Sequence, residues 1–210
     1  MIKSNYDRAQ LAQVRDAFDI AELHSVALEK GFLVRLGQKF LVQMYCHLIE
    51  KEVTFILRNN EGSLLGFVAA SCYTHGLMKR FLFSRPLMLL KLASLLLRQP
   101  QLMKSIVETA LVSLKLKIKD SRTESIDLPE VEILAIAVDP SAQHQGVGSR
   151  LIEALEEQFN FRGIRRYKVI AGDRLVEANR FYKKSGFCMV GQITIHGNDV
   201  SNIYTKEISN

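Results

Sequence analysis

The stretch Gln143-His144-Gln145-Gly146-Val147-Gly148 lies between an apolar run at residues 133–138 and an amphipathic segment at residues 149–161. The apolar run predicts a buried strand, and the spacing of apolar residues after the glycines predicts a helix. A strand that passes into a helix at two closely spaced glycines leaves main-chain N–H groups unpaired at the helix N-terminus. Such a turn favours the binding of an anion, and of a phosphate group in particular.

Two better-known glycine-rich phosphate loops do not fit this stretch. The dinucleotide-binding fingerprint requires a third glycine that is missing here, and a P-loop requires a Gly-Lys-Ser or Gly-Lys-Thr ending. Taken alone, the turn leaves two interpretations open, a phosphate site and a tight turn without a ligand.

A second motif lies downstream, Ala178-Asn179-Arg180-Phe181-Tyr182-Lys183-Lys184-Ser185-Gly186-Phe187. It predicts a short helix that ends at Gly186 and is followed by a strand. The two motifs, Q-x-x-G-x-G after a strand and A-N-x-F-Y-x-x-x-G-F before one, resemble the GNAT superfamily of acetyl-CoA-dependent N-acetyltransferases. The resemblance covers residues 131–187, and residues 10–72 show a compatible pattern. It implies an α/β (α+β) fold, a GNAT-like mixed and mostly antiparallel central sheet of about seven strands flanked by helices.

Composition and charge are typical of a single globular domain over residues 1–210. Hydrophobic residues make up 48% of the chain and charged residues 24%, which separates it from disordered proteins. The three cysteines form no C-x-x-C pair, so we expect neither disulfides nor a zinc site, and a cytoplasmic location fits best. We also expect no signal peptide and no membrane-spanning segment.

The hydrophobic pattern predicts the order of the elements around the two motifs. Before the glycine turn we expect a strand at 11–15, a helix from a cap at Asp19 to residue 28, a helix around 40–48, and a hairpin of strands 53–57 and 63–70. After it we expect a helix at 149–161, a strand at 167–171, a helix ending near 185, and strands at 187–194 and 200–206.

Residues 74–129 lack strand signals and are rich in leucine, methionine and lysine, so we expect a helical insertion between the third and fourth strands, with helices at 87–99 and 102–119. Residues 76–119 contain nine basic residues and one acidic residue, against a net charge of +6 for the whole chain. The insertion is interpreted as a lid that packs on the sheet or on the second subunit of a homodimer, as a peripheral contact with anionic lipid, or as a site for an acidic sugar nucleotide. We expect no nucleic-acid partner, because few aromatic residues are interleaved with the basic ones.

The resemblance implies acetyl-CoA as cosubstrate and no metal. The amides of the glycine turn would bind its pyrophosphate, and the main chain at the end of the preceding strand would pair with the pantetheine amides. Many family members carry an asparagine where this chain has Leu175, which weakens the resemblance at that position. Asn179, one turn before Tyr182, is expected either to bind the coenzyme or to be exposed. The predicted coenzyme-binding residues are Ile136, Ala137, Val138, Gln143, His144, Gln145, Gly146, Val147, Gly148, Ser149 and Asn179.

Two side chains are predicted to be catalytic. The resemblance places the phenol of Tyr182 near the sulfur, and with an ordinary pKa of ~10 it is protonated at neutral pH and suited to return a proton there. The alternative is an aromatic packing residue with its hydroxyl at the surface. Glu132 begins the strand before the glycine turn, and family members of several branches place a glutamate at this distance from the motif glutamine. A carboxylate there that is partly removed from water would take a proton from the amine. Glu130, two residues earlier on the same strand face, is the alternative base.

The acceptor is not named by any motif. Residues 29–37, between the first two predicted helices, form a loop in which Phe32 and Arg35 are the predicted substrate contacts. The predicted function is acetyl transfer to a primary amine of a small molecule, an amino sugar or a nucleotide-linked amine. The alternatives are a protein or longer-chain acyltransferase and a non-catalytic acyl-CoA-binding module.

Overall fold

The computed structural model describes residues 8–29, 31–74, 76–85, 127–195 and 199–208. The chain forms two compact units, each built from separate segments. The first unit comprises Met1–Cys72, Ile133–Arg165 and Ile208–Asn210, and the second comprises Tyr73–Glu132 and Arg166–Glu207. Seven strands fall within the described residues.

The first unit contains the N-terminal strands and the strand that leads into the glycine turn. The strands lie in the order β1 (Gln10–Leu11), β2 (Val53–Arg58), β3 (Leu64–Ser71) and β4 (Glu132–Val138), of which residues 133–138 belong to this unit. Both β1 and β3 pair with β2 in antiparallel register. The predicted hairpin is confirmed, and the Asn59 side chain shapes its turn by accepting the N–H groups of Glu61 and Ser63.

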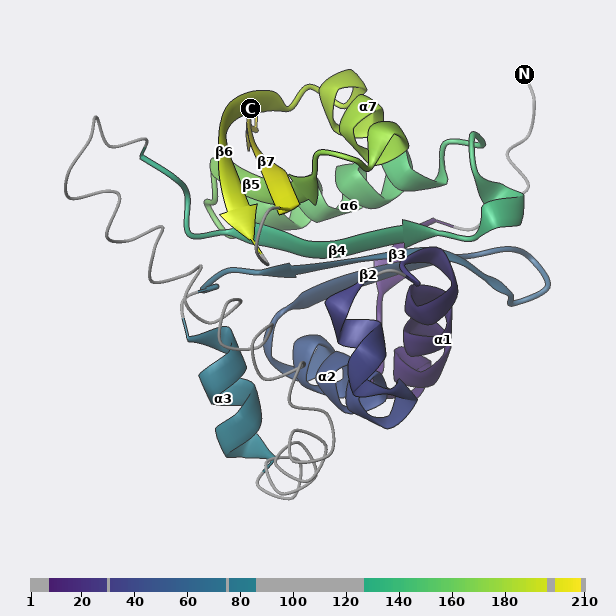
Figure 1. The fold of residues 1–210 in the computed structure, drawn as a ribbon. Helices are drawn as coiled ribbons and strands as arrows, with labels where there is room; N and C mark the ends of the chain where they lie inside the picture. The colour runs from purple at the N-terminus through teal and green to yellow at the C-terminus, as the bar shows by residue number, and fades with distance from the viewer. Residues whose placement is uncertain (1–7, 30, 75, 86–126, 196–198, 209–210) are drawn as a thin grey trace. The chain divides into compact units, whose positions relative to one another are not determined.

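Helices cover both faces of these strands. Figure 1 shows α1 (Ala17–Ala27) and α2 (Gln38–Lys51) on one side of β2 and β3, and α6 (Val147–Phe161) on the other. Because side chains alternate along a strand, Gly66 faces α6 while Phe67 packs against Tyr45 of α2, with ring centroids 5.3 Å apart. The core of this unit is therefore formed on both faces of β3.

The start of the chain differs from the prediction. The first strand is only two residues long, and Val14–Asp16 form a 3-10 turn in which Asp16 Oδ2 accepts the N–H of Gln13 at 2.7 Å. Helix α1 begins directly after this turn, so Asp19 lies inside the helix and the prediction that it caps the helix is wrong.

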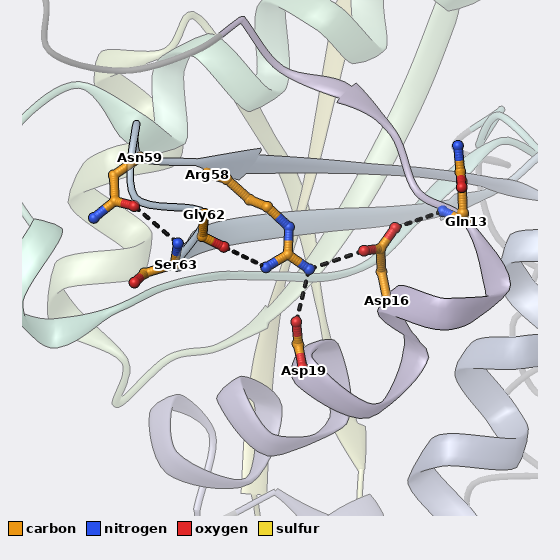
Figure 2. Close-up of polar contacts among 7 residues, drawn as sticks. All are labelled: Gln13, Asp16, Asp19, Arg58, Asn59, Gly62 and Ser63. Carbon is orange, nitrogen blue, oxygen red and sulfur yellow. Dashed lines mark hydrogen bonds and ion pairs between the residues drawn. The ribbon is translucent and has the colours of Figure 1, made fainter.

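The Asp19 carboxylate binds the side chain of Arg58 instead (Figure 2). Arg58 Nη2 donates to Asp16 Oδ1 at 2.8 Å and to Asp19 Oδ2 at 2.7 Å, while its Nη1 donates to the carbonyl oxygen of Gly62 at 2.7 Å. One guanidinium group thus ties the start of α1 to the β2–β3 hairpin. A planar fork of donors is suited to such a link, because it meets several acceptors at once.

The second unit carries the Tyr182 motif. Its elements are α3 (Leu77–Ser84), β5 (Arg166–Gly172), α7 (Val176–Lys184), β6 (Cys188–Ile195) and β7 (Asp199–Glu207). The strands lie in the order β5-β7-β6, and both pairs are antiparallel. Helix α7 ends as predicted, with Gly186 in the left-handed conformation at φ 84°.

The predicted fold class is confirmed. The protein is mixed α/β, with seven strands that pair mostly antiparallel and helices packed on them. Helix α3 lies in the predicted insertion, whereas the helices predicted at 87–99 and 102–119 fall outside the described residues. The interpretations of the insertion and the single-domain organisation therefore stay predictions. No helix in the described ranges is both long and apolar enough to cross a membrane.

Candidate active site

The glycine turn of the first unit has a distinct backbone shape. After β4 the Asp139 carboxylate accepts the N–H of Ser141 at 2.8 Å and holds a 3-10 turn at Pro140–Ala142. The chain then passes through two left-handed residues, His144 at φ 62° and Gly146 at φ 80°, before α6 begins. Glycine meets this requirement without strain at the second position.

The shape leaves donors exposed at the start of α6. In the part of the chain that the structure describes, the N–H groups of Gly146, Val147 and Gly148 donate no backbone hydrogen bond, as expected for a first helical turn. A Cβ placed on Gly146 would meet no atom within 4 Å, so the main chain is open on that side. Unpaired amides and the positive end of the helix dipole together fit a phosphate group.

The side chains of the turn have different surroundings. Gln145 is exposed, and its Nε2 donates to the carbonyl oxygen of Ser141 at 2.8 Å, so this side chain braces the loop. Gln143, His144 and Ser149 are also exposed, whereas Val147 is buried. Main-chain rather than side-chain atoms are therefore the natural ligands here.

The start of α6 is held in place by a close approach to β3. A Cβ on Gly66 would lie 2.9 Å from the carbonyl oxygen of Ala137 and 2.9 Å from Val147 Cγ1. Real Cβ atoms do not come so close, so only glycine lets β3, β4 and the first turn of α6 pack together here. Gly66 thus supports the predicted coenzyme loop, and its role was missed in the sequence.

Strand β4 has one mostly buried face, on which Ala135 is half-buried, and one half-buried face. Ile133 and Ala137 are buried, while Leu134, Ile136 and Val138 are half-buried. The half-buried face is the one predicted to look toward the coenzyme. Glu132, the first residue of β4, belongs to the second unit together with its partner Lys168.

The Glu132 carboxylate is largely removed from water. Its side chain is 14% exposed, and its Oε2 lies 3.5 Å from Nζ of Lys168 on β5. Burial raises the pKa of Glu132 above its usual value, while the positive charge of Lys168 and hydrogen bonds from Lys168 and Thr74 oppose that rise. Glu130, the alternative base, is exposed, so burial distinguishes Glu132 from it.

Lys168 is the residue near Glu132 that sequence reasoning missed. It lies within an apolar strand and is 7% exposed. Its Nζ donates to the carbonyl oxygens of Pro129 and Glu130 in addition to its ion pair with Glu132. A lysine inside an apolar run was the available signal, because lysine is almost never buried without a partner.

Tyr182 lies in an aromatic cluster of the second unit. Its ring contacts Phe181, Phe187 and Tyr204, with centroids 5.4 to 5.8 Å apart. The residue is 5% exposed, and burial raises the pKa of its phenol above the usual value. Within the described residues its hydroxyl has no hydrogen-bond partner.

Asn179, one turn before Tyr182, is buried and fully hydrogen-bonded. Its Nδ2 donates to the carbonyl oxygens of Gly172, Asp173 and Leu175, and its Oδ1 accepts from Asn202 Nδ2 and Tyr204 Oη, both at 2.9 Å. No amide donor or lone pair is left for a coenzyme. These contacts favour a positioning role for Asn179, anchoring α7 to β5 and β7, over the predicted coenzyme contact.

The predicted acceptor loop belongs to the first unit. Phe32–Leu36 form a 3-10 helix between α1 and α2, and Gly37 precedes α2 at φ 89°. Arg35 is exposed. Among the described residues, no three His, Cys, Asp or Glu side chains are placed to hold a metal ion.

Comparisons with known proteins agree with this fold. A model of the acetyltransferase (GNAT) family matches residues 101–187. Ard1 from Thermoplasma volcanium shares 15% identity at a TM-score of 0.59, covering 96% of this chain and 97% of that chain. The ribosomal-protein-S18-alanine N-acetyltransferase from Escherichia coli shares 16% at 0.58, covering 96% and 94%, and an agmatine N-acetyltransferase shares 13% at 0.65, covering 97% and 99%.

No curated protein matches the sequence. At these identities the solved structures establish the fold, while the family model covers both sequence motifs. The chain is therefore similar to GNAT acetyltransferases in sequence over residues 101–187 and in its fold as a whole.

Proposed function

We propose that this protein transfers an acetyl group from acetyl-CoA to a primary amine of a small molecule, with Glu132 as base and Tyr182 as acid. The observation that carries the proposal is the family match, because residues 101–187 contain Glu132, the glycine turn and Tyr182. The surroundings of each group, taken separately, support the role given to it.

The glycine turn is the proposed pyrophosphate site. Its support is the set of unpaired N–H groups at Gly146 to Gly148 and the open main chain at Gly146. The main chain of Ile136, Ala137 and Val138 would hold the pantetheine amides like an added strand. Both contacts use backbone atoms, so apolar side chains at these positions do not argue against them.

The two side chains supply the proton transfers of direct attack. The amine nitrogen forms a bond to the thioester carbon, its proton passes to Glu132, and the carbon–sulfur bond breaks as the sulfur takes the proton of Tyr182. A raised pKa suits Glu132 to hold a proton taken from the amine, and the phenol of Tyr182 is protonated at neutral pH and can supply a proton to the thiolate.

The acceptor is proposed to lie against the loop that contains Phe32 and Arg35. Arg35 is exposed, and its guanidinium is suited to a phosphate or carboxylate on the acceptor. An amino sugar phosphate or a nucleotide-linked amine would meet this requirement. The second candidate is a protein amine, since one similar structure is a ribosomal-protein-S18-alanine N-acetyltransferase.

Coenzyme binding is tested by calorimetry with acetyl-CoA. Gly146→Glu places a carboxylate on the turn, and we expect it to abolish binding by charge repulsion and by strain at φ 80°. Gly163→Glu is the matched control, because Gly163 is also left-handed, at φ 72°, but follows the far end of α6. Equal binding by both variants would contradict the proposed pyrophosphate site.

Catalysis is tested by thiol release from acetyl-CoA over a panel of amines that includes amino sugars, nucleotide-linked amines, polyamines and peptides. Turnover with one class identifies the acceptor. Turnover with peptides alone supports the second candidate, and tight acetyl-CoA binding without turnover on any amine supports a non-catalytic module. Glu132→Gln should reduce turnover with the active amine, whereas normal turnover places the base elsewhere.

A further inference from the structure

Lys168 presents a buried ammonium group to the carboxylate of Glu132. Its side chain is 9% exposed, and the two charged atoms lie 3.5 Å apart. The main-chain N–H of Lys168 also donates to the carbonyl oxygen of Val131 at 2.9 Å. The residue is thus fixed at its backbone and at its side-chain end, beside the start of β4.

The three N–H groups of this ammonium have three acceptors. They are the carbonyl oxygens of Pro129 and Glu130 and the carboxylate of Glu132. Burial of a charged lysine is costly unless the charge is paired and every donor is satisfied. Lys168 meets both conditions, and its position relative to Glu132 is therefore well determined.

Two opposite effects act on Glu132. Removal from water disfavours the carboxylate and can raise the pKa of a fully buried glutamate to ~8–9, where it would be protonated at neutral pH. The ammonium of Lys168 disfavours protonation, because protonated Glu132 would leave a buried positive charge uncompensated. Of the described charged groups, Lys168 faces Glu132, while Glu130, two residues before β4, is exposed. The Thr74 hydroxyl adds a neutral hydrogen bond that it shares with the carbonyl oxygen of Glu130.

We propose that Lys168 is a positioning residue that keeps Glu132 ionised and oriented as the base at neutral pH. This inference rests on the proposed function, in which Glu132 takes the amine proton. In this proposal Lys168 contacts neither the coenzyme nor the acceptor. It affects the reaction only through Glu132.

The variant Lys168→Gln removes the charge and keeps a side-chain N–H donor. An opposite charge at this distance typically lowers the pKa of a carboxyl group by ~1–3 units. In Lys168→Gln the acid limb of the profile of kcat/KM against pH should therefore shift to higher pH by ~1–3 units. The value of kcat/KM should fall tenfold or more at pH 7 and recover near pH 9. Lys168→Arg keeps the charge, so its acid limb should lie at the same pH as that of the wild type.

The matched control is Lys184→Gln, which removes the same charge from an exposed position on α7. Its acid limb should coincide with that of the wild type. A limb that stays in place in Lys168→Gln, or a loss of equal size at every pH, overturns the inference, because a merely structural role would not depend on pH. Failure of both Lys168→Gln and Lys168→Met to fold, with Lys168→Arg folded, also overturns it in favour of a structural role.

Glu132→Gln separates this inference from the function on which it rests. Loss of activity in Glu132→Gln, with an unmoved limb in Lys168→Gln, rejects the role of Lys168 and leaves the base in place. Normal activity in Glu132→Gln rejects the base itself, and the role of Lys168 falls with it.

Discussion

In the core of the first unit, Nδ1 of His24 lies 2.6 Å from the hydroxyl oxygen of Tyr45. Both residues are buried, and the two rings meet at 62° with centroids 5.7 Å apart. Burial raises the pKa of Tyr45, so the phenol keeps its proton and can donate it to Nδ1. When the phenol donates in this contact, Nδ1 accepts and the neutral imidazole carries its proton on Nε2.

The stability of the protein should therefore fall in mild acid. Burial lowers the pKa of His24 from 6.5 to about 4. Between these two values the unfolded chain binds a proton that the folded chain excludes, so stability decreases as pH falls from 6.5 to 4 and the dependence on this group ends below 4. The loss amounts to roughly 3 kcal/mol over that range. Urea unfolding at a series of pH values would measure it.

The histidine variants provide the control for this pH dependence. His24→Gln should flatten the slope between pH 6.5 and 4, whereas His144→Gln should leave it unchanged because His144 is exposed. Parallel slopes in the wild type and His24→Gln would assign the acid sensitivity to other groups.

The two carboxylates bound by Arg58 should differ in their contribution to stability. The side chain of Asp16 is 10% exposed, whereas that of Asp19 is 45% exposed. Asp16 also accepts the N–H of Gln13, so Asp16→Ala leaves two donors without an acceptor. We expect a cost of roughly 2 kcal/mol for Asp16→Ala and of about 0.5 kcal/mol for Asp19→Ala. Equal urea midpoints for the two variants would contradict this ranking.

Local turn chemistry explains why much of the fold was predictable from the sequence. The hairpin at residues 59–62 and the left-handed Gly146 are set by residues close to them in the chain. The cap assigned to Asp19 failed because its partner, Arg58, comes from a hairpin far along the chain. Helix propensity alone carries no information about such a partner.

Long-range contacts also explain what was missed in the candidate site. The coenzyme contact of Asn179 stays a prediction, and the contacts that favour a positioning role for it come from Asn202 and Tyr204 on β7. The burial of Lys168 depends in the same way on carbonyl groups of Pro129 and Glu130. Glu132 and Tyr182 were selected by resemblance, and their catalytic roles stay predictions.

The close approach at Gly66 should make it intolerant of any side chain. Gly66→Ala places a Cβ against the Ala137 carbonyl oxygen and Val147, which requires the first turn of α6 to shift. We expect a loss of ~1–3 kcal/mol in stability and weaker acetyl-CoA binding, measured by urea unfolding and calorimetry. The control is Gly172→Ala, since a Cβ there would lie 3.6 Å from its nearest neighbour, an ordinary contact. Wild-type coenzyme affinity in Gly66→Ala would show that this packing does not support the turn.

Removal of two tyrosine hydroxyls of the second unit should affect different properties of the protein, activity in one case and stability in the other. The hydroxyl of Tyr182 has no hydrogen-bond partner among the described residues, so Tyr182→Phe should fold with unchanged thermal stability. If that hydroxyl returns the proton to sulfur, kcat should fall by ~100-fold or more. The hydroxyl of Tyr204 donates to Asn179 Oδ1 at 2.9 Å, so Tyr204→Phe should lose about 1 kcal/mol of stability with little change in kcat.

Thermal melts and steady-state kinetics on the two tyrosine variants decide between a catalytic and a packing role for Tyr182. Both rings lie in one aromatic cluster, with centroids 5.8 Å apart, so a general disturbance of that cluster would affect both variants alike. A fall in kcat confined to Tyr182→Phe, together with a fall in Tm confined to Tyr204→Phe, would support a catalytic role for Tyr182 and a structural role for Tyr204. Full activity in Tyr182→Phe would mean that solvent or another group protonates the thiolate, because the ring without its hydroxyl has no proton to give.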